Sequence, residues 1–495
     1  MLCIYIYNMP RCKSSCKDLA PAECDGKETC KYCDGRVRHF CRLSHKYKYG
    51  DNCKITRRFR KKEQQKGSKL VDFMRRTKHA RVSNFLKNVC QDAGQCLSFG
   101  TETKKITDFF GGFKEFNYVN GTINTIASGA NGFVKEIKYT HRGYNAYALL
   151  KSNMSPDADN LYYEYIVGQY INTFVPIFPC FVQTYGLYKY NSLSDYDAMK
   201  HSKITEPSII KRNTTLIKRP SFSDVCENTK LYCILIQHIK SRYNSVVPLS
   251  NMLKDKEFLD NDFLYVLLQV YIPLSTIYNT FTHYDLHTSN VLLYTLTDDT
   301  YIKYTYHLPN NKEITFLSKY IVKIIDYGRC FFKDSVNKKN SKKIYKEVCK
   351  TSTCDPECGI NNGFAYLIPE QYPGEAYFIC SSKRNMSHDL RLVNDCVLSI
   401  ASSKMPKVML KIKDIIKYGV GIADPYEEHF GTKENIKNGY PKRINNVKDM
   451  AQALIEEAIV MSTQSENELY YSKKKCYGKM DIYCDSLRPT RFIIE

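Results

Sequence analysis

Two short segments in the second half of the chain carry side chains that could bind a cation and activate a hydroxyl group. In the first, Asp285 follows His283, and Asn290 stands five positions after Asp285. In the second, an apolar run at residues 322–325 ends in Asp326, and a glycine follows. Carboxylate and amide oxygens are the ligands that Mg²⁺ prefers, because it is a hard cation. An Asp-x-Gly sequence alone is typical of any turn, but its place after the first segment favours a shared role.

A glycine-containing segment lies upstream, between two strand-like runs. It consists of Ile126, Ala127, Ser128, Gly129, Ala130, Asn131, Gly132, Phe133 and Val134. Its glycines would let the backbone approach a phosphate group closely. Lys151 ends the next strand-like run. A lone lysine on a strand is usually just exposed, so the order of these segments before the two acidic ones is what makes them candidates for a phosphate-binding site.

In this order the segments resemble the motifs of the protein-kinase superfamily. Asp285 lies in a match to the catalytic loop, Asp326 in a match to the Asp-Phe-Gly motif with Tyr for Phe, and Asp389 in a match to the start of the central helix of the C-lobe. The phrases His-x-Asp-Leu-His, Ile-Asp-Tyr-Gly and Ser-His-Asp-Leu-Arg recur in the divergent serine/threonine kinases of large nucleocytoplasmic DNA viruses, which this chain resembles most. The resemblance covers residues 118–470.

The resemblance implies a role for each matching residue. Asp285 would orient the acceptor hydroxyl, and Asn290 and Asp326 would hold Mg²⁺. Lys151 would align the phosphates of ATP, and Glu164 on the following helix would hold Lys151. The weaker candidates for that partner are Asp157, Asp159 and Glu206. Catalysis would then come mainly from positioning and charge neutralisation.

Other matches concern support and nucleotide contact. Strand alternation is expected to place Ala148 beneath the adenine and Lys151 beside the phosphates. Asp389 would hold the catalytic loop through its backbone, and His283 would brace that loop rather than react. Residues 368–370, Ile-Pro-Glu, resemble the end of an activation segment, and the linker that meets adenine is expected near residues 236–240.

The chain departs from the family pattern at three positions. Ala127 stands where the first loop glycine is usual, and Tyr284 replaces the Arg that pairs with an activation-loop phosphate in many kinases. His287 replaces the Lys that serine/threonine kinases use against the transferred phosphate. The Asp-Leu-His-x-x-Asn wording also occurs in kinases of small molecules, so a small-molecule phosphotransferase is an alternative. A pseudokinase scaffold that binds anionic partners is another, although none of the key Lys and Asp positions is lost.

The sequence as a whole predicts an α+β, bilobal kinase-like fold with a β-rich N-lobe, a mainly helical C-lobe and a Cys-rich, basic N-terminal extension. The predicted domains are residues 1–53, a linker or arm at 54–108, an N-lobe at 109–240 with a polar insertion loop at 191–230, and a C-lobe at 241–495. Strands are expected at 117–126, 132–140, 144–150, 181–190 and 231–236, helices at 157–173 and 262–282, mostly helix at 389–459, and a closing hairpin at 479–484 and 490–494.

Charge and composition indicate partners and compartment. The 495 residues include 73 Lys and Arg against 51 Asp and Glu, a net charge of +22. Half of that net charge lies at residues 54–88, which suggests nucleic acid, an acidic partner or an anionic membrane surface, or simply a solvated face. No apolar run is long enough for a membrane span. We expect an intracellular protein with cysteines mostly as thiols or metal ligands rather than disulfides. It would lie in the host cytoplasm if viral, with packaging in virions compatible with that origin.

The N-terminal cysteines suggest a zinc site. Cys30, Cys33, Cys41 and His45 supply four nitrogen or sulfur ligands at short spacings, as a tetrahedral zinc site requires. A Cys-rich segment without a strict paired repeat is also often unliganded or disulfide-linked. Bound zinc, free thiols and disulfides therefore all stay open for these cysteines. Cys349, Cys354 and Cys358 form a looser second cluster.

Overall fold

The computed structural model divides the chain into two compact units, Met1–Phe85 and Leu86–Glu495. The structure describes residues 30–34, 39–43, 96, 99–128, 132–153, 161–220, 224–225, 228–240, 246–295, 299–348, 364–367, 376–379, 381–416, 444, 446–463 and 466–495. In the first unit the described backbone is an antiparallel hairpin of β1 (Cys30–Asp34) and β2 (His39–Leu43). No helix among the described residues combines the length and apolar content of a membrane span.

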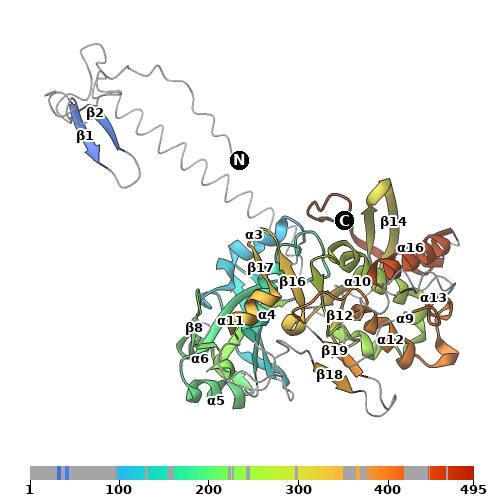
Figure 1. Ribbon diagram of the computed structural model, residues 1–495, viewed down its shortest axis with the longest axis horizontal. Helices are drawn as coiled ribbons and strands as arrows, with labels where there is room; N and C mark the ends of the chain where they lie inside the picture. Colours follow the sequence, from blue (N-terminus) through green and yellow to red (C-terminus); the bar gives the residue numbers. More distant parts are fainter. Residues whose placement is uncertain are drawn as a thin grey trace. The chain divides into compact units, whose positions relative to one another are not determined.

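A seven-stranded antiparallel sheet forms the first half of the larger unit (Figure 1). Its strand order is β7-β3-β4-β5-β9-β6-β8. The bounds are β3 Ile123–Ser128, β4 Gly132–His141, β5 Tyr144–Asn153, β6 Thr184–Tyr190, β7 Ile204–Thr205, β8 Thr214–Leu216 and β9 Tyr232–His238. The turn between β4 and β5 places Arg142 and Gly143 at φ 51 and 83, the positive values that a tight two-residue hairpin turn requires.

Helices α4, α5 and α6 accompany this sheet. Helix α4 (Leu161–Ile171) is buried along most of its length, because nearly all its residues are apolar or aromatic. Helices α5 (Leu193–His201) and α6 (Pro207–Asn213) occupy the segment predicted to be a polar loop. That expectation was wrong because Tyr196, Met199 and Ile210 are fully buried and give both helices an apolar face that polarity averaged over the segment conceals.

Helix α3 (Glu102–Phe109) belongs to the same compact unit, which begins well before the N-lobe boundary predicted at residue 109. Its buried Thr103 and Ile106 face the unit, and the ring of Phe99 just before it packs edge-on against Phe492 near the C-terminus. The segment after the basic arm is therefore part of the core, not of a linker.

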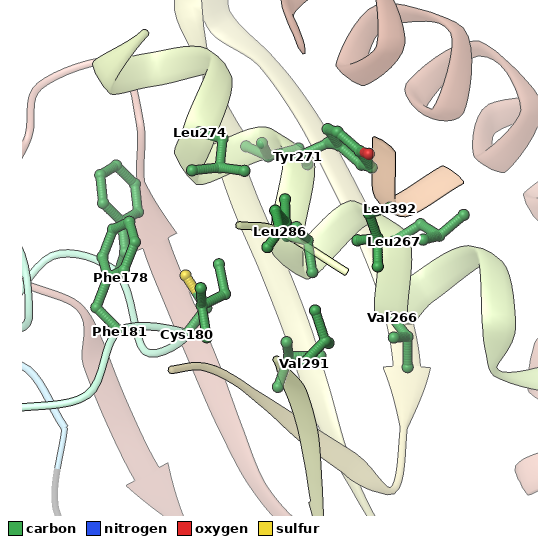
Figure 2. Packing of buried hydrophobic residues seen from close by; sticks show 14 of the residues in the cluster. Phe178, Cys180, Phe181, Val266, Leu267, Tyr271, Leu274, Leu286, Val291 and Leu392 are labelled. Carbon is green, nitrogen blue, oxygen red and sulfur yellow. The ribbon is translucent and has the colours of Figure 1, made fainter. Parts of the chain in front are cut away.

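The second half of the unit is built on helix α10 (Phe263–Ile277), which is apolar and buried on all sides. Figure 2 shows α10 residues Val266, Leu267, Tyr271 and Leu274 near Leu286, Val291 and Leu392 from other elements, all in one buried cluster. The other helices here are α8 Leu249–Met252, α9 Lys256–Asn261, α11 Ser341–Val348, α12 Arg391–Ser399, α13 Lys407–Ile412, α16 Val447–Thr463 and α17 Glu466–Tyr471. This combination of a curled antiparallel sheet and a helical half is compatible with a protein-kinase-like fold.

Short strands connect the helical half to the loops that carry the candidate site. Two three-stranded sheets have the orders β10-β12-β15 and β11-β16-β17, and β18 pairs with β19. The bounds are β10 Val247–Pro248, β11 Phe281–Thr282, β12 Val291–Thr295, β15 Tyr320–Ile324, β16 Phe331–Asp334, β17 Lys339–Asn340, β18 Phe364–Leu367 and β19 Ala376–Ile379.

A four-stranded sheet of order β14-β13-β20-β21 closes the unit. The predicted terminal hairpin corresponds to β20 (Lys475–Tyr483) and β21 (Arg491–Ile494). Strand β20 also pairs in parallel with β13 (Thr300–Leu308), whose own antiparallel partner is β14 (Lys312–Ser318). The hairpin of β13 and β14 was not anticipated, and it ties the chain end to the segment between the two acidic motifs.

The terminal hairpin is therefore expected to stabilise the whole unit. Met480 is fully buried and lies opposite Tyr304 of β13. Replacing it in Met480→Ala should lower the free energy of unfolding by about 2–4 kcal/mol, because a large buried side chain is removed. Urea unfolding followed by fluorescence would measure this. The exposed neighbour in Lys479→Ala is the matched control and should change little, since its ion pair with Glu495 is at the surface. Equal effects for both variants would contradict this role.

Candidate active site

An ion-paired lysine joins three elements at the centre of the candidate site. The Lys151 Nζ on β5 lies 2.9 Å from the Glu164 Oε2 of α4 and 2.8 Å from the Asp326 Oδ1 that follows β15. Glu164 is buried, as a partner held inside the unit should be. Of the predicted acidic partners that the structure describes, Glu164 is the one that pairs with Lys151. Asp157 and Asp159 lie outside the described residues.

Electrostatics keep this group charged. Burial alone would lower the pKa of Lys151, but Asp326 and Glu164 raise it above its ordinary value. Burial would likewise raise the pKa of Asp326, but the ammonium group of Lys151 keeps it below its ordinary value. A partly buried ion pair of this kind still costs desolvation free energy, so its presence points to a function rather than to stability.

The backbone at Asp326 is held in an unusual conformation. Its φ of 70 lies in the left-handed region, which a non-glycine residue adopts at a cost. The next residue, Tyr327, is buried, and its hydroxyl donates to the carbonyl of Ile324 at 2.9 Å and accepts from the N–H of Val182 at 3.0 Å. The tyrosine that replaces phenylalanine in this motif therefore finds two partners and fixes the turn that aims Asp326.

A second tyrosine connects α4 to the segment after that turn. The Tyr163 hydroxyl lies 2.6 Å from the carbonyl oxygen of Cys330 and 2.8 Å from Ser341 Oγ. Ser341 in turn accepts from the N–H of Phe332 at 2.7 Å. Since Tyr163 adjoins Glu164, the position of the acid that holds Lys151 depends on the conformation of this segment.

The loop that carries Asp285 rests on a buried carboxylate. Asp389 accepts hydrogen bonds from the N–H groups of His283 at 2.8 Å and Tyr284 at 2.9 Å. Tyr284 has a φ of 65, so these two bonds hold the loop in a conformation that it would otherwise avoid. Burial raises the pKa of Asp389 to about 7, and the two N–H groups act against that rise.

His283 links this loop to the strand that precedes Asp326. It is fully buried, and its Nε2 lies 3.0 Å from the carbonyl oxygen of Ile325. Its Nδ1 has no hydrogen-bond partner among the described residues. Burial lowers the pKa of His283 to about 4, so the ring is neutral at physiological pH. This contact connects the loop to the residue that precedes Asp326.

Asp285 and Asn290 are connected within the same loop. The side-chain Nδ2 of Asn290 donates to the backbone carbonyl of Asp285 at 2.8 Å. The backbone carbonyl of Asn290 accepts from the N–H of Ile325 at 3.0 Å. The amide nitrogen is thus used inside the protein, and the amide oxygen remains for a cation beside the Asp326 segment. An amide oxygen and a carboxylate form a donor set that suits Mg²⁺.

The side chain of Asp285 has a partner that the motif comparison assigned no role. The Arg391 Nη1 at the start of α12 lies 2.9 Å from Asp285 Oδ1. The Nε2 of His287 is farther away, at 3.8 Å from the same oxygen. Arg391 stands in the Ser-His-Asp-Leu-Arg phrase, so the only signal in the sequence was its position two residues after Asp389.

The expectation for Ala148 requires a correction. Ala148 and Lys151 lie three residues apart on β5, and side chains of a strand alternate between faces, so the two lie on opposite faces. Ala148 is fully buried and pairs with Ile137 and Gln237. Leu149, two residues from Lys151, shares its face and is partly exposed, and correct counting along the strand could have identified it.

Only the two ends of the glycine-containing segment are described. Ile126, Ala127 and Ser128 end β3, whereas Phe133 and Val134 belong to β4, and Ile126 is 49% exposed. A Cβ atom on Gly132 would lie 2.4 Å from the carbonyl oxygen of Ser152, so only glycine fits there. Gly129, Ala130 and Asn131 lie outside the described residues.

Several other predictions fall outside the described residues or side chains. For Cys30, Cys33 and Cys41 only the backbone is described, and His45, residues 54–88, residues 368–370 and the second cysteine cluster lie outside. Within the described part of the chain, no group of three His, Cys, Asp or Glu side chains is arranged to hold a metal ion. Cysteines 180, 233, 330, 396, 476 and 484 are free thiols, whereas Cys96 is disulfide-bonded.

A cavity in the larger unit lies beside the predicted adenine linker, since Gln237, His238 and Ile239 line it. Its lining includes Thr103 and Thr107 of α3, Gln183, and Gln237 of β9. None of the residues predicted to act in catalysis lines it.

No family model matches the chain, and no curated protein matches it. The matching solved structures include a Plasmodium kinase domain with 13% identity and a TM-score of 0.23, which covers 48% of this chain. The chain spans 61% of that structure's length. These values assign no family, and the resemblance to viral kinases stays a prediction.

The buried imidazole predicts acid sensitivity. A histidine whose pKa falls from about 6.5 unfolded to about 4 folded contributes stability that is complete above pH 6.5 and is lost as the pH falls through 4. Between pH 7 and 4.5 this amounts to about 2–3 kcal/mol. His283→Gln keeps a donor for Ile325 but cannot titrate, so it should lose that much less stability. Urea unfolding at both pH values checks this, and an equal acid loss in the variant would refute it.

Proposed function

We propose that this chain is an ATP-dependent protein kinase that transfers the γ-phosphoryl group to Ser or Thr hydroxyls. The observation that carries the proposal is the bridge from Lys151 to both Glu164 and Asp326. It joins a lysine of the sheet, an acid of a helix and an acid after an apolar strand in the arrangement that phosphoryl transfer uses. The loop with Asp285 and Asn290 is tied to the same strand through Ile325.

Each charged group has a distinct task in the proposed reaction. Lys151, held by Glu164, binds phosphate oxygens of ATP. Asn290 and Asp326 would hold Mg²⁺, which when bound neutralises phosphate charge. By strand register Leu149 and the β9 residues Ile236 and His238 lie on the lysine face of the sheet, and they would contact the base.

Asp285 acts on the acceptor. Its carboxylate accepts a hydrogen bond from the acceptor hydroxyl and aims the oxygen at the γ-phosphorus. A new oxygen–phosphorus bond forms, the bond to the β-phosphate oxygen breaks and ADP leaves. The hydroxyl proton passes to Asp285 and then to solvent.

The acceptor class is the part of the proposal with a specific competitor. His287 stands where a protein kinase usually has a lysine, and the same loop wording occurs in small-molecule kinases. A protein acceptor is favoured by the length in sequence of the segment from Arg329 to Tyr366, since a small-molecule kinase needs an enclosed acceptor pocket instead. A scaffold without catalysis is disfavoured by the retention of Lys151, Asp285 and Asp326.

The transfer itself is the first measurement. With γ-labelled ATP, Mg²⁺ and a mixture of casein and basic protein, we expect label on Ser or Thr. Lys151→Met and Asp326→Ala should abolish transfer, and Asp285→Asn should reduce it at least about 10²-fold. Lys138→Met removes a lysine from β4 of the same sheet and should leave transfer intact. Binding of Mg-ATP without any transfer to protein would turn the proposal toward a small-molecule acceptor or a scaffold.

Activity should not depend on an activation-loop phosphate. Tyr284 carries no charge, is fully buried, and donates its hydroxyl to the Lys383 carbonyl at 2.8 Å. It therefore cannot pair with a phosphate as an arginine does. Phosphatase treatment of the purified protein, verified by mass spectrometry, should leave its subsequent activity within about two-fold, a difference of less than about 0.5 kcal/mol. A large loss of activity would contradict this expectation.

A further inference from the structure

The catalytic loop is held by two charged residues from a single turn of the chain. Asp389 accepts the backbone N–H groups of His283 and Tyr284, and Arg391, two residues later, pairs with the Asp285 side chain at 2.9 Å. The backbone and the side chain of the loop are therefore fixed from the same short segment. That segment opens α12, whose Leu392, Val393 and Cys396 are buried.

The pair between Arg391 and Asp285 is well shielded. The side chains are 14% and 17% exposed, so water competes weakly for either charge. In the described part of the chain, Arg391 is the one Lys or Arg that pairs with Asp285. Lys151 is 2.8–2.9 Å from two other carboxylates. Arg391 also approaches Asp395 one helical turn later, with 3.9 Å between Nε and Oδ2.

Arg391 contacts one of the two carboxylate oxygens of Asp285. The hydrogen bond from Arg391 Nη1 is made to Oδ1. A guanidinium is planar, stays charged at any physiological pH and holds a carboxylate with directional bonds. Fixing one oxygen in this way limits rotation of the carboxylate.

We propose that Arg391 is the positioning residue for Asp285, so that the start of α12 orients the catalytic carboxylate toward the acceptor hydroxyl. This rests on the proposed kinase function and deepens it. Within the loop, the His287 Nε2 lies 3.8 Å from the Asp285 carboxylate, farther than Arg391, so Arg391 is the better placed of the two to orient it. Arg391 acts through Asp285 and has no step of its own in the transfer. The acceptor proton still passes to Asp285 and the phosphoryl group to the acceptor.

The test compares kinetic constants for wild type, Arg391→Met and Arg391→Lys. We expect Arg391→Met to lower kcat about 10- to 100-fold, with the KM for ATP within about two-fold, because misplacing a catalytic group affects the transfer and not nucleotide binding. Arg391→Lys should recover part of kcat, and added guanidinium ion at low concentration should recover part of the activity of Arg391→Met. A purely structural role would give no such chemical rescue.

Two controls make the result specific. Arg384→Met removes an arginine of the same segment that donates instead to Asn279, and should keep wild-type kcat. In an Asp285→Asn background, adding Arg391→Met should lower kcat by less than about two-fold, since the residue acts through that carboxylate. Thermal unfolding of each variant checks that it folds. If Arg391→Met does not fold, Arg391→Lys is the deciding variant, and a kcat between those of wild type and Asp285→Asn would support the inference.

The outcomes separate this inference from the proposed function. If wild type transfers phosphate and Arg391→Met matches Arg384→Met, the inference fails while the kinase proposal stands. An independent, multiplicative loss in the Asp285→Asn background also overturns the inference. If wild type transfers no phosphate to any acceptor, it is the proposed function that fails.

Discussion

The candidate site depends first on a carboxylate that has been taken out of water. Asp389 is buried below the loop that carries Asp285, and burial raises its pKa to about 7. A buried carboxylate needs donors, and it finds them in two consecutive backbone N–H groups of that loop. These bonds hold Tyr284 at a positive φ. The need of the buried carboxylate for donors therefore stabilises the loop conformation.

The surrounding core makes this arrangement stable. Tyr271 of the apolar helix α10 donates its hydroxyl to the Asp389 carbonyl at 2.8 Å, so the helix reaches the same turn. Tyr284 above it packs against His388, with 4.8 Å between ring centroids. Tyr271 and Tyr284 thus do two tasks, since each ring fills the core while its hydroxyl donates to a backbone carbonyl.

Tyrosines have a similar part around the ion pair of Lys151. Tyr327 fixes the turn at Asp326, and Tyr163 connects α4 to the segment beyond it. Both side chains are buried and hydrogen-bonded to backbone oxygens. The three charged groups of the site therefore lie in a framework of uncharged donors, which holds their geometry without adding competing charge.

The sequence by itself determined the local elements and the candidate residues. Strand alternation marks β4 and β5, a long apolar run marks α10, and short motifs single out Lys151, Asp285 and Asp326, because all these signals are local. Only the tertiary structure decided which groups meet. It brought Arg391 to Asp285 from 106 residues away, paired β20 with β13 in parallel, and folded the polar segment at 191–230 into helices. Such contacts depend on how separate elements pack together in three dimensions, and the spacing of residues along the chain does not predict them.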